Sequence, residues 1–79
     1  MATETLGDYR VGISFNPSKD ALVDRIKHAA AMIIDMCEEA RTDADDPEKA
    51  RLWSLAQTHF EDGAMWAVKA ATKRLRNGG

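Results

Sequence analysis

Residues 42–48 read Thr-Asp-Ala-Asp-Asp-Pro-Glu, and this short polar stretch decides how the chain folds. Asp46 suits the capping position of a helix, Pro47 suits the first helical residue, and the acidic Glu48 suits the first turn. The stretch therefore separates two helices. Helices joined by so short a connection pack antiparallel, so these residues predict a helical hairpin.

The first long helix is expected before this turn. Asn16 is a good N-cap and Pro17 suits the first helical position, with Ser18 as an alternative cap. Residues 21–40 contain neither glycine nor proline, so nothing in them breaks a helix. Their apolar residues recur at the spacing of one helix face, which comprises Leu22, Ile26, Ala29, Ala30, Ile33 and Cys37.

The second helix is expected to run from about Pro47 to about Arg76, where Asn77-Gly78-Gly79 provides a stop. Gly63 lies in its middle among alanines, which favours close approach of another helix over a slight bend. One face of this helix carries Leu52, Ala56, Phe60, Gly63, Ala67, Ala70 and Arg74, and a second apolar line carries Trp53, Ala64 and Val68. Two long helices share only one seam, so surplus Trp, Met and Ile side chains leave an exposed apolar patch, the usual mark of an interface.

These patterns predict an all-α fold. Residues 1–15 form a partly ordered N-terminal arm, and residues 16–79 form an antiparallel two-helix hairpin. A chain of 79 residues allows one domain with a modest core, and oligomerisation is a common remedy at this size. We therefore expect the hairpin to assemble into a homo-oligomer.

Composition excludes several classes of protein. The formal net charge is −2, from 11 basic and 13 acidic side chains, which argues against a DNA or RNA binder. The one cysteine, Cys37, permits no disulfide within the chain and reads as a small core residue. No apolar stretch is long enough to span a membrane, and the N-terminus lacks a signal-peptide pattern, so we expect a cytosolic protein.

Charge is separated along the predicted hairpin. Acidic residues gather near the turn, whereas basic residues of both helices gather at the open end. Complementarity with the helix dipole explains the bases that end the second helix, but it does not explain Lys27, well inside the first. The basic residues are Lys19, Arg25, Lys27, Lys69, Lys73, Arg74 and Arg76. A small anionic ligand at the open end fits this arrangement.

Aromatic residues near the open end allow two interpretations. Tyr9 and Phe15 flank the start of the first helix, where each could stack on a nucleobase or fill a groove between subunits. For Trp66 the groove is the better interpretation. Catalysis has little support, because His28 and His59 lie on different helices and match no metal-binding motif. We predict no enzyme, no cofactor and no metal site.

Two segments resemble a known family. The first is Phe15-Asn16-Pro17-Ser18 with the following Val23 and Ile26-Lys27. The second is Ala56-Gln57-Thr58-His59-Phe60-Glu61 with the following Met65-Trp66-Ala67-Val68-Lys69. Together they resemble the phage anti-CBASS sponge proteins, which are related to the hairpin domain of anti-Thoeris sponges. The resemblance covers about residues 9–73.

The resemblance implies a homohexamer that acts in the cytoplasm of an infected bacterial host. Such proteins bind cyclic dinucleotides, for example cyclic GMP-AMP, between subunits and sequester them uncleaved, which blocks effector activation. Some members also bind cyclic trinucleotides near the three-fold axis. By this resemblance the dinucleotide residues are Tyr9, Phe15, Asn16 and Lys27, with Tyr9 or Phe15 stacking on a base and Lys27 contacting phosphate. The trinucleotide residues are Lys69 and Lys73.

A second hypothesis needs no nucleotide. The wide apolar stripe and the acidic turn also suit a helical oligomeric interaction module that binds a host protein. A nucleotide response separates the two hypotheses, because only a sponge is stabilised by cyclic nucleotides.

Overall fold

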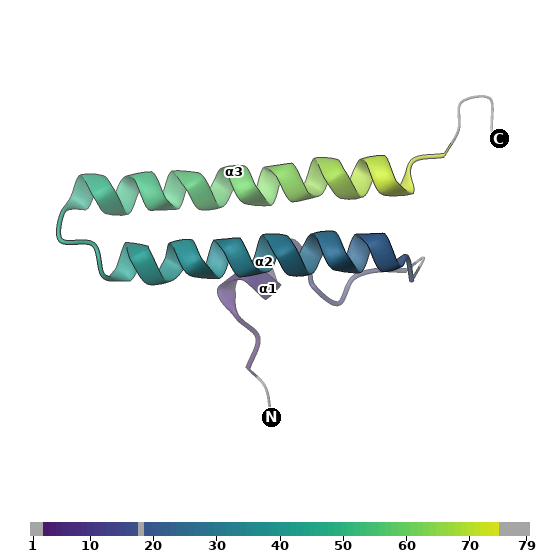
Figure 1. Cartoon of the computed structure of the whole chain (residues 1–79), viewed down its shortest axis with the longest axis horizontal. Coiled ribbons are helices and arrows are strands. Elements are labelled where there is room, and N and C mark those ends of the chain that lie inside the picture. The colour runs from purple at the N-terminus through teal and green to yellow at the C-terminus, as the bar shows by residue number, and fades with distance from the viewer. Residues whose placement is uncertain (1–2, 18, 75–79) are drawn as a thin grey trace.

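A computed structural model of the chain describes residues 3–17 and 19–74. It contains three helices, α1 (Leu6–Val11), α2 (Ala21–Thr42) and α3 (Pro47–Thr72), and no strand within the described residues. The long helices α2 and α3 lie side by side and antiparallel, and α1 packs against the middle of α2 (Figure 1). The predicted all-helical hairpin is confirmed.

The turn between the long helices forms as its sequence predicts. Asp46 is the N-cap of α3, and its carboxylate accepts a hydrogen bond from the Glu48 N–H at 3.1 Å. Pro47 is the first helical residue. This cap satisfies a backbone donor that has no acceptor within the helix, which fixes where α3 begins.

The predicted start of the first long helix is wrong. Asp20, not Asn16, caps α2, because Lys19 adopts a left-handed backbone (φ 54°) that interrupts any helix from Pro17. Instead, Asn16 Oδ1 accepts a hydrogen bond from the Asp20 N–H. Asn16 Nδ2 donates to the Asp20 carbonyl oxygen and to the Asp24 carboxylate. The alternative cap, Ser18, lies outside the described residues.

The far end of α3 also differs from the prediction. The helix ends at Thr72, one turn before Arg76. Arg76 and the predicted stop at residues 77–79 lie outside the described residues.

The N-terminal segment contains a short helix that the sequence analysis did not predict. In α1, the Thr5 hydroxyl accepts the Asp8 N–H at 3.0 Å, and the Asp8 carboxylate accepts the Thr5 N–H at 3.2 Å. This reciprocal capping box starts the helix. Gly12, with φ 62°, ends it.

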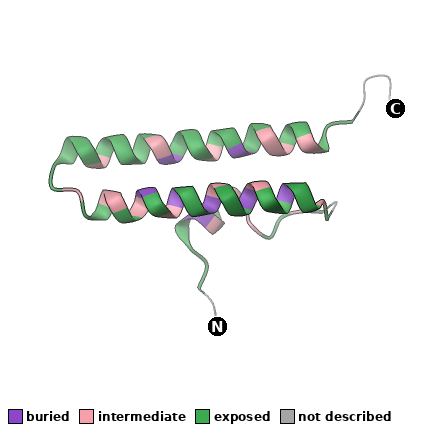
Figure 2. Ribbon diagram, in the orientation of Figure 1, coloured by how far each residue is buried: buried purple, intermediate pink, exposed green. Residues whose placement is uncertain are grey.

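The core lies along α2, where α3 and α1 pack against it, and is small (Figure 2). Its buried apolar residues are Val23, Ala31, Ile34, Cys37 and Ala64. Gln57 is buried there too, and its Nε2 donates to the Ile34 carbonyl oxygen at 3.2 Å and to Glu38 Oε1 at 3.1 Å. Cys37 is therefore the core residue that the sequence predicts.

Apart from Cys37, the buried apolar residues of the long helices lie one position after residues of the main predicted faces. Val23 and Ile34 are buried, whereas their neighbours Leu22 and Ile33 are exposed. On α3, Ala64 is buried and Gly63 is exposed. Apolar residues occupy so much of each helix circumference that periodicity fits more than one face. The face that is buried is selected by packing against α1 and against residues 12–17. Periodicity within one helix carries no information about such packing.

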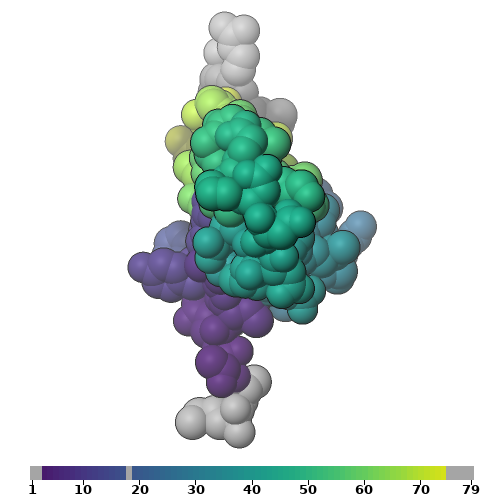
Figure 3. All heavy atoms as spheres, turned by 90° about the vertical axis from the view of Figure 1, so that its left-hand side faces the viewer, coloured from purple at the N-terminus to yellow at the C-terminus, as the bar shows by residue number. Residues whose placement is uncertain are grey.

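The molecule is a thin slab of 52 × 32 × 13 Å, seen along its long axis in Figure 3. Many large apolar side chains remain exposed because so thin a body has little interior. The most exposed of those on the long helices are Met32, Met36, Met65 and Trp66. The surplus apolar surface that the sequence predicts is present. None of the helices in the described ranges combines the length and hydropathy needed to cross a membrane.

Candidate ligand-binding site

Lys27 is the organising residue of the site. Its side chain is only 6% exposed, and its Nζ donates to the carbonyl oxygens of Gly12, at 2.9 Å, and Phe15. The ammonium also lies 5.5 Å from the centroid of the Phe15 ring, within cation–π range. The segment between α1 and α2 is therefore folded over Lys27 and held by it.

The charge of Lys27 has no acidic partner in the part of the chain that the structure describes. Within residues 3–17 and 19–74, no carboxylate lies at ion-pair distance from its ammonium. An ammonium has three N–H donors, and the two carbonyls occupy two of them. A buried cation held only by dipoles keeps its attraction for anions. This arrangement suits a phosphate that reaches the remaining donor.

Two cavities meet at Lys27, and both have Val68 as a second wall. The first, of about 210 Å³, is otherwise lined by Val11, Glu61, Ala64 and Met65. The second, of about 240 Å³, is otherwise lined by Phe15, Asn16, Pro17, Val23 and Thr72. Each is smaller than the roughly 300 Å³ at which small-molecule pockets normally begin. A ligand the size of a dinucleotide therefore needs walls from outside this chain.

The structure brings three of the four predicted dinucleotide residues together. Phe15, Asn16 and Lys27 line one cavity. Tyr9 lines neither of the two cavities and projects from α1 with 74% of its surface exposed, while Phe15 is 73% exposed. Both rings are free to stack on a base, but they lie on different elements of the fold.

Of the two predicted trinucleotide residues, only Lys69 lines a hollow beside an aromatic ring. Lys69, in the last turn of α3, places its ammonium 5.1 Å from the Trp66 ring centroid. These two residues, with Asp62 and Met65, line a hollow of about 180 Å³. Lys73 is exposed, follows the last helical residue and does not line that hollow.

Sequence reasoning missed the contacts that hold α1 in place. Arg10 forms an ion pair with Glu61 of α3, and the Gly7 N–H donates to Asp35 Oδ1 of α2 at 2.7 Å. The Thr5 and Asp8 capping box was the local signal for this helix. No sequence pattern identifies Asp35 and Glu61 as the partners of α1, because they are distant from it along the chain.

Glu38 is the described group whose pKa departs furthest from its ordinary value. Two hydrogen bonds from Arg41, at 2.9 and 2.7 Å, and one from Gln57 lower the pKa of Glu38 from 4.5 to about 2. Arg41 is on the same helix, whereas Gln57 comes from α3. Glu38 therefore remains ionised and supports the hairpin seam.

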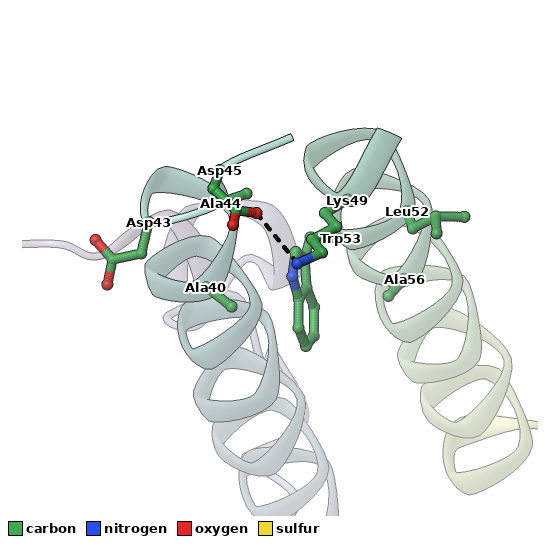
Figure 4. A pocket seen from close by; sticks show the side chains of 8 residues that line it. All are labelled: Ala40, Asp43, Ala44, Asp45, Lys49, Leu52, Trp53 and Ala56. Atoms are coloured by element: carbon green, nitrogen blue, oxygen red, sulfur yellow. Dashed lines mark hydrogen bonds and ion pairs between the residues drawn. The ribbon is translucent and has the colours of Figure 1, made fainter. Parts of the chain in front are cut away.

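A wider cavity lies at the turn end, the acidic part of the chain that the second hypothesis assigned to a host protein (Figure 4). Its volume is about 720 Å³, and its walls are Ala40, Asp43, Ala44, Asp45, Lys49, Leu52, Trp53 and Ala56. The Trp53 indole lies between α2 and α3, and Lys49 is paired with Asp45 at 3.1 Å. The apolar floor and the paired charge suit a protein surface more than a phosphate.

Within the described ranges, no group of three or more histidine, cysteine, aspartate or glutamate side chains is arranged to hold a metal ion. His28 and His59 are both exposed.

Comparison with known proteins gives one match. A family model described as the Acb2/Tad1 hairpin domain matches residues 8–72, which is most of the chain. No curated protein and no solved structure matches it significantly.

Proposed function

The chain belongs to the Acb2/Tad1 hairpin domain family, and we propose that it is a phage sponge for cyclic oligonucleotide second messengers. It binds the messenger and sequesters it without cleaving it, so the immune effector is not activated. The observation that supports this best is the buried Lys27 ammonium, which lies beside the exposed Phe15 ring and has no acidic partner among the described residues.

The site suits the chemistry of a cyclic dinucleotide. Such a ligand offers two phosphates, which need a cation, and two bases, which need flat surfaces. Lys27 supplies the cation and one remaining N–H donor. Phe15 or Tyr9 supplies the flat surface, and base–aromatic stacking contributes about 1–3 kcal/mol for each base. Asn16 lines the same cavity as Phe15.

The ligand is held between subunits of a homo-oligomer, which we propose is a hexamer. Neither cavity beside Lys27 reaches the size of a complete ligand pocket. Exposed Met and Trp side chains on both long helices provide the surface for subunit contacts. A second subunit therefore both covers apolar surface and completes the site.

A second class of ligand, the cyclic trinucleotide, is proposed for the hollow beside Lys69 and Trp66, with Lys73 near the end of the same helix. The charge and the indole are available there. Lysine offers no bidentate fork to phosphate, so this site holds its ligand less firmly than an arginine would.

A thermal-shift screen against cyclic di- and trinucleotides tests the proposal, with native mass spectrometry of the same samples. A sponge melts at a higher temperature with its messenger, by mass action, and the messenger is recovered intact after heat denaturation. No shift with any member of the panel would rule out this function. A cleaved messenger would point to an enzyme instead.

The turn-end cavity favours one alternative. Its size and its Trp53 wall suit a helical oligomeric module that binds a host protein. Stoichiometric recovery of one host protein by the tagged chain, together with no nucleotide response, would favour this function. The Trp53→Ala variant should then lose that partner.

A further inference from the structure

Helix α1 depends on contacts with the rest of the fold. It has six residues, and a helix this short has almost no stability in water by itself. The capping box of Thr5 and Asp8 satisfies only its first donors. Its order must therefore come from α2 and α3.

Gly7 brings the backbone of α1 directly against α2. It is buried, and a Cβ at this position would overlap the carbonyl oxygen of Ala31 and lie 2.8 Å from the Ala31 Cα. These are backbone atoms in the middle of a long helix, so they have little freedom to move aside. Glycine alone permits this approach.

Asp35 completes the contact one turn further along α2. Its Oδ1 accepts the Gly7 N–H at 2.7 Å. That N–H belongs to the first turn of α1, where the helix itself offers no acceptor. Asp35 therefore acts as a charged cap supplied by another helix. Arg10, in the last turn of α1, pairs with Glu61 on α3, so both ends of α1 are held.

Tyr9 lies between these two attachments. Its side chain makes no hydrogen bond within the described residues and is mostly exposed, so its position is set by α1 alone. We propose that Gly7 and Asp35 are positioning residues, which dock α1 on α2 and thereby present the Tyr9 ring to a cyclic nucleotide. The ligand in this inference rests on the proposed function, whereas the docking rests on the contacts themselves.

Docking and affinity are linked quantitatively. If only molecules with α1 docked bind, the apparent Kd rises by the inverse of the docked fraction. A variant with α1 docked in about one molecule in ten therefore binds about tenfold more weakly.

Hydrogen exchange of the amides of residues 6–11, in the full-length protein without ligand, measures docking. Gly7→Ala is diagnostic because alanine favours helix formation, so a free α1 would gain protection whereas a docked α1 loses it. Asp35→Ala removes the acceptor, and Asp35→Asn, which keeps an oxygen in that place, is the matched control. We expect faster exchange in G7A and D35A but near-normal exchange in D35N, with unchanged helical circular dichroism.

Calorimetric titration of the same variants with cyclic GMP-AMP tests the second step. We expect affinity in Gly7→Ala and Asp35→Ala to fall by the factor that exchange gives for docking. Tyr9→Ala should lose affinity while α1 stays protected. Unchanged protection overturns the docking role, and lost protection with normal affinity overturns the link to Tyr9. A wild-type protein that binds no cyclic nucleotide overturns the proposed function, and the exchange data then still decide whether Gly7 and Asp35 hold α1.

Discussion

The ammonium of Lys27 donates a hydrogen bond to the carbonyl oxygen of Phe15, twelve positions earlier in the chain. Phe15 thus contributes both a backbone acceptor and an aromatic face to the same cation. Lys27 has two roles as a result. It closes the segment between α1 and α2, and it supplies the positive charge of the proposed site.

Lys27→Met should therefore affect folding as well as binding. Methionine keeps the apolar stem but leaves the carbonyls of Gly12 and Phe15 without their donor, which costs about 1–3 kcal/mol. We expect a lower free energy of unfolding in urea and no measurable cyclic dinucleotide binding. Arg25→Met is the matched control, because it removes one exposed charge from the same helix. Normal nucleotide affinity in Lys27→Met would show that the phosphates bind elsewhere.

Stability should fall in acid partly through Glu38. The pKa of Glu38 is about 2 in the folded chain against an ordinary 4.5, so its stabilisation is complete above about pH 4.5 and is lost as the pH falls to about 2. Its side chain is 31% exposed, and solvent screening reduces the contribution to about 1 kcal/mol.

Urea unfolding of wild type and Glu38→Gln at about pH 6 and about pH 2.5 checks this expectation. The difference between the two proteins should be large at the higher pH and should shrink at the lower. Glu48→Gln is the control. Arg51 lowers the pKa of Glu48 too, but the Glu48 side chain is 59% exposed, so its charge should contribute less to stability. A difference that is constant with pH would contradict the role of the Glu38 charge.

Lys69→Glu should separate the two proposed ligand classes. Reversing the charge beside Trp66 places a carboxylate where trinucleotide phosphates would lie, so we expect cyclic trinucleotide binding to fall at least about tenfold. Dinucleotide binding should stay within about twofold, since Lys69 lines neither cavity at Lys27. Lys49→Glu makes the same charge change at the turn end of α3 and should affect neither ligand. Competition titrations with both ligand classes measure this, and equal losses for both would refute separate sites.

Gly63→Ala should test whether a second copy approaches α3 closely. Within the described chain a Cβ at this position meets nothing within 4 Å, so no helix of the same chain makes the close approach that the sequence predicts. We propose that a helix of a second copy makes it. We expect alanine to strengthen the helix by about 1 kcal/mol yet to weaken assembly. Native mass spectrometry over a dilution series measures the assembly. A higher melting temperature with an unchanged oligomer would mean that Gly63 faces solvent.

Strong local signals made the hairpin predictable. Asp46 and Pro47 start α3 where their chemistry requires, and antiparallel packing follows from the short turn. The start of α2 was not predictable in this way. Asn16 and Pro17 satisfy every local rule for a cap, but the left-handed backbone at Lys19 separates them from the helix.

The candidate site was predicted only in part, because its contacts link distant parts of the chain. The burial of Lys27 depends on carbonyls of another segment, and the order of α1 depends on Asp35 and Glu61. Periodicity reports only neighbours along one helix. The prediction of a nucleotide ligand came from the family resemblance, because no local sequence pattern indicates one.

Gln57 also determines the relative alignment of the two long helices. The seam around it is built of small or smooth apolar side chains, which would tolerate sliding of one helix past the other. Its amide, however, meets the Ile34 carbonyl and the Glu38 carboxylate at one setting only. A slip by one helical turn, about 5.4 Å, would separate this amide from the Glu38 carboxylate. This contact therefore favours one register of the hairpin. In that register, the surface residues of α2 have fixed axial positions relative to those of α3.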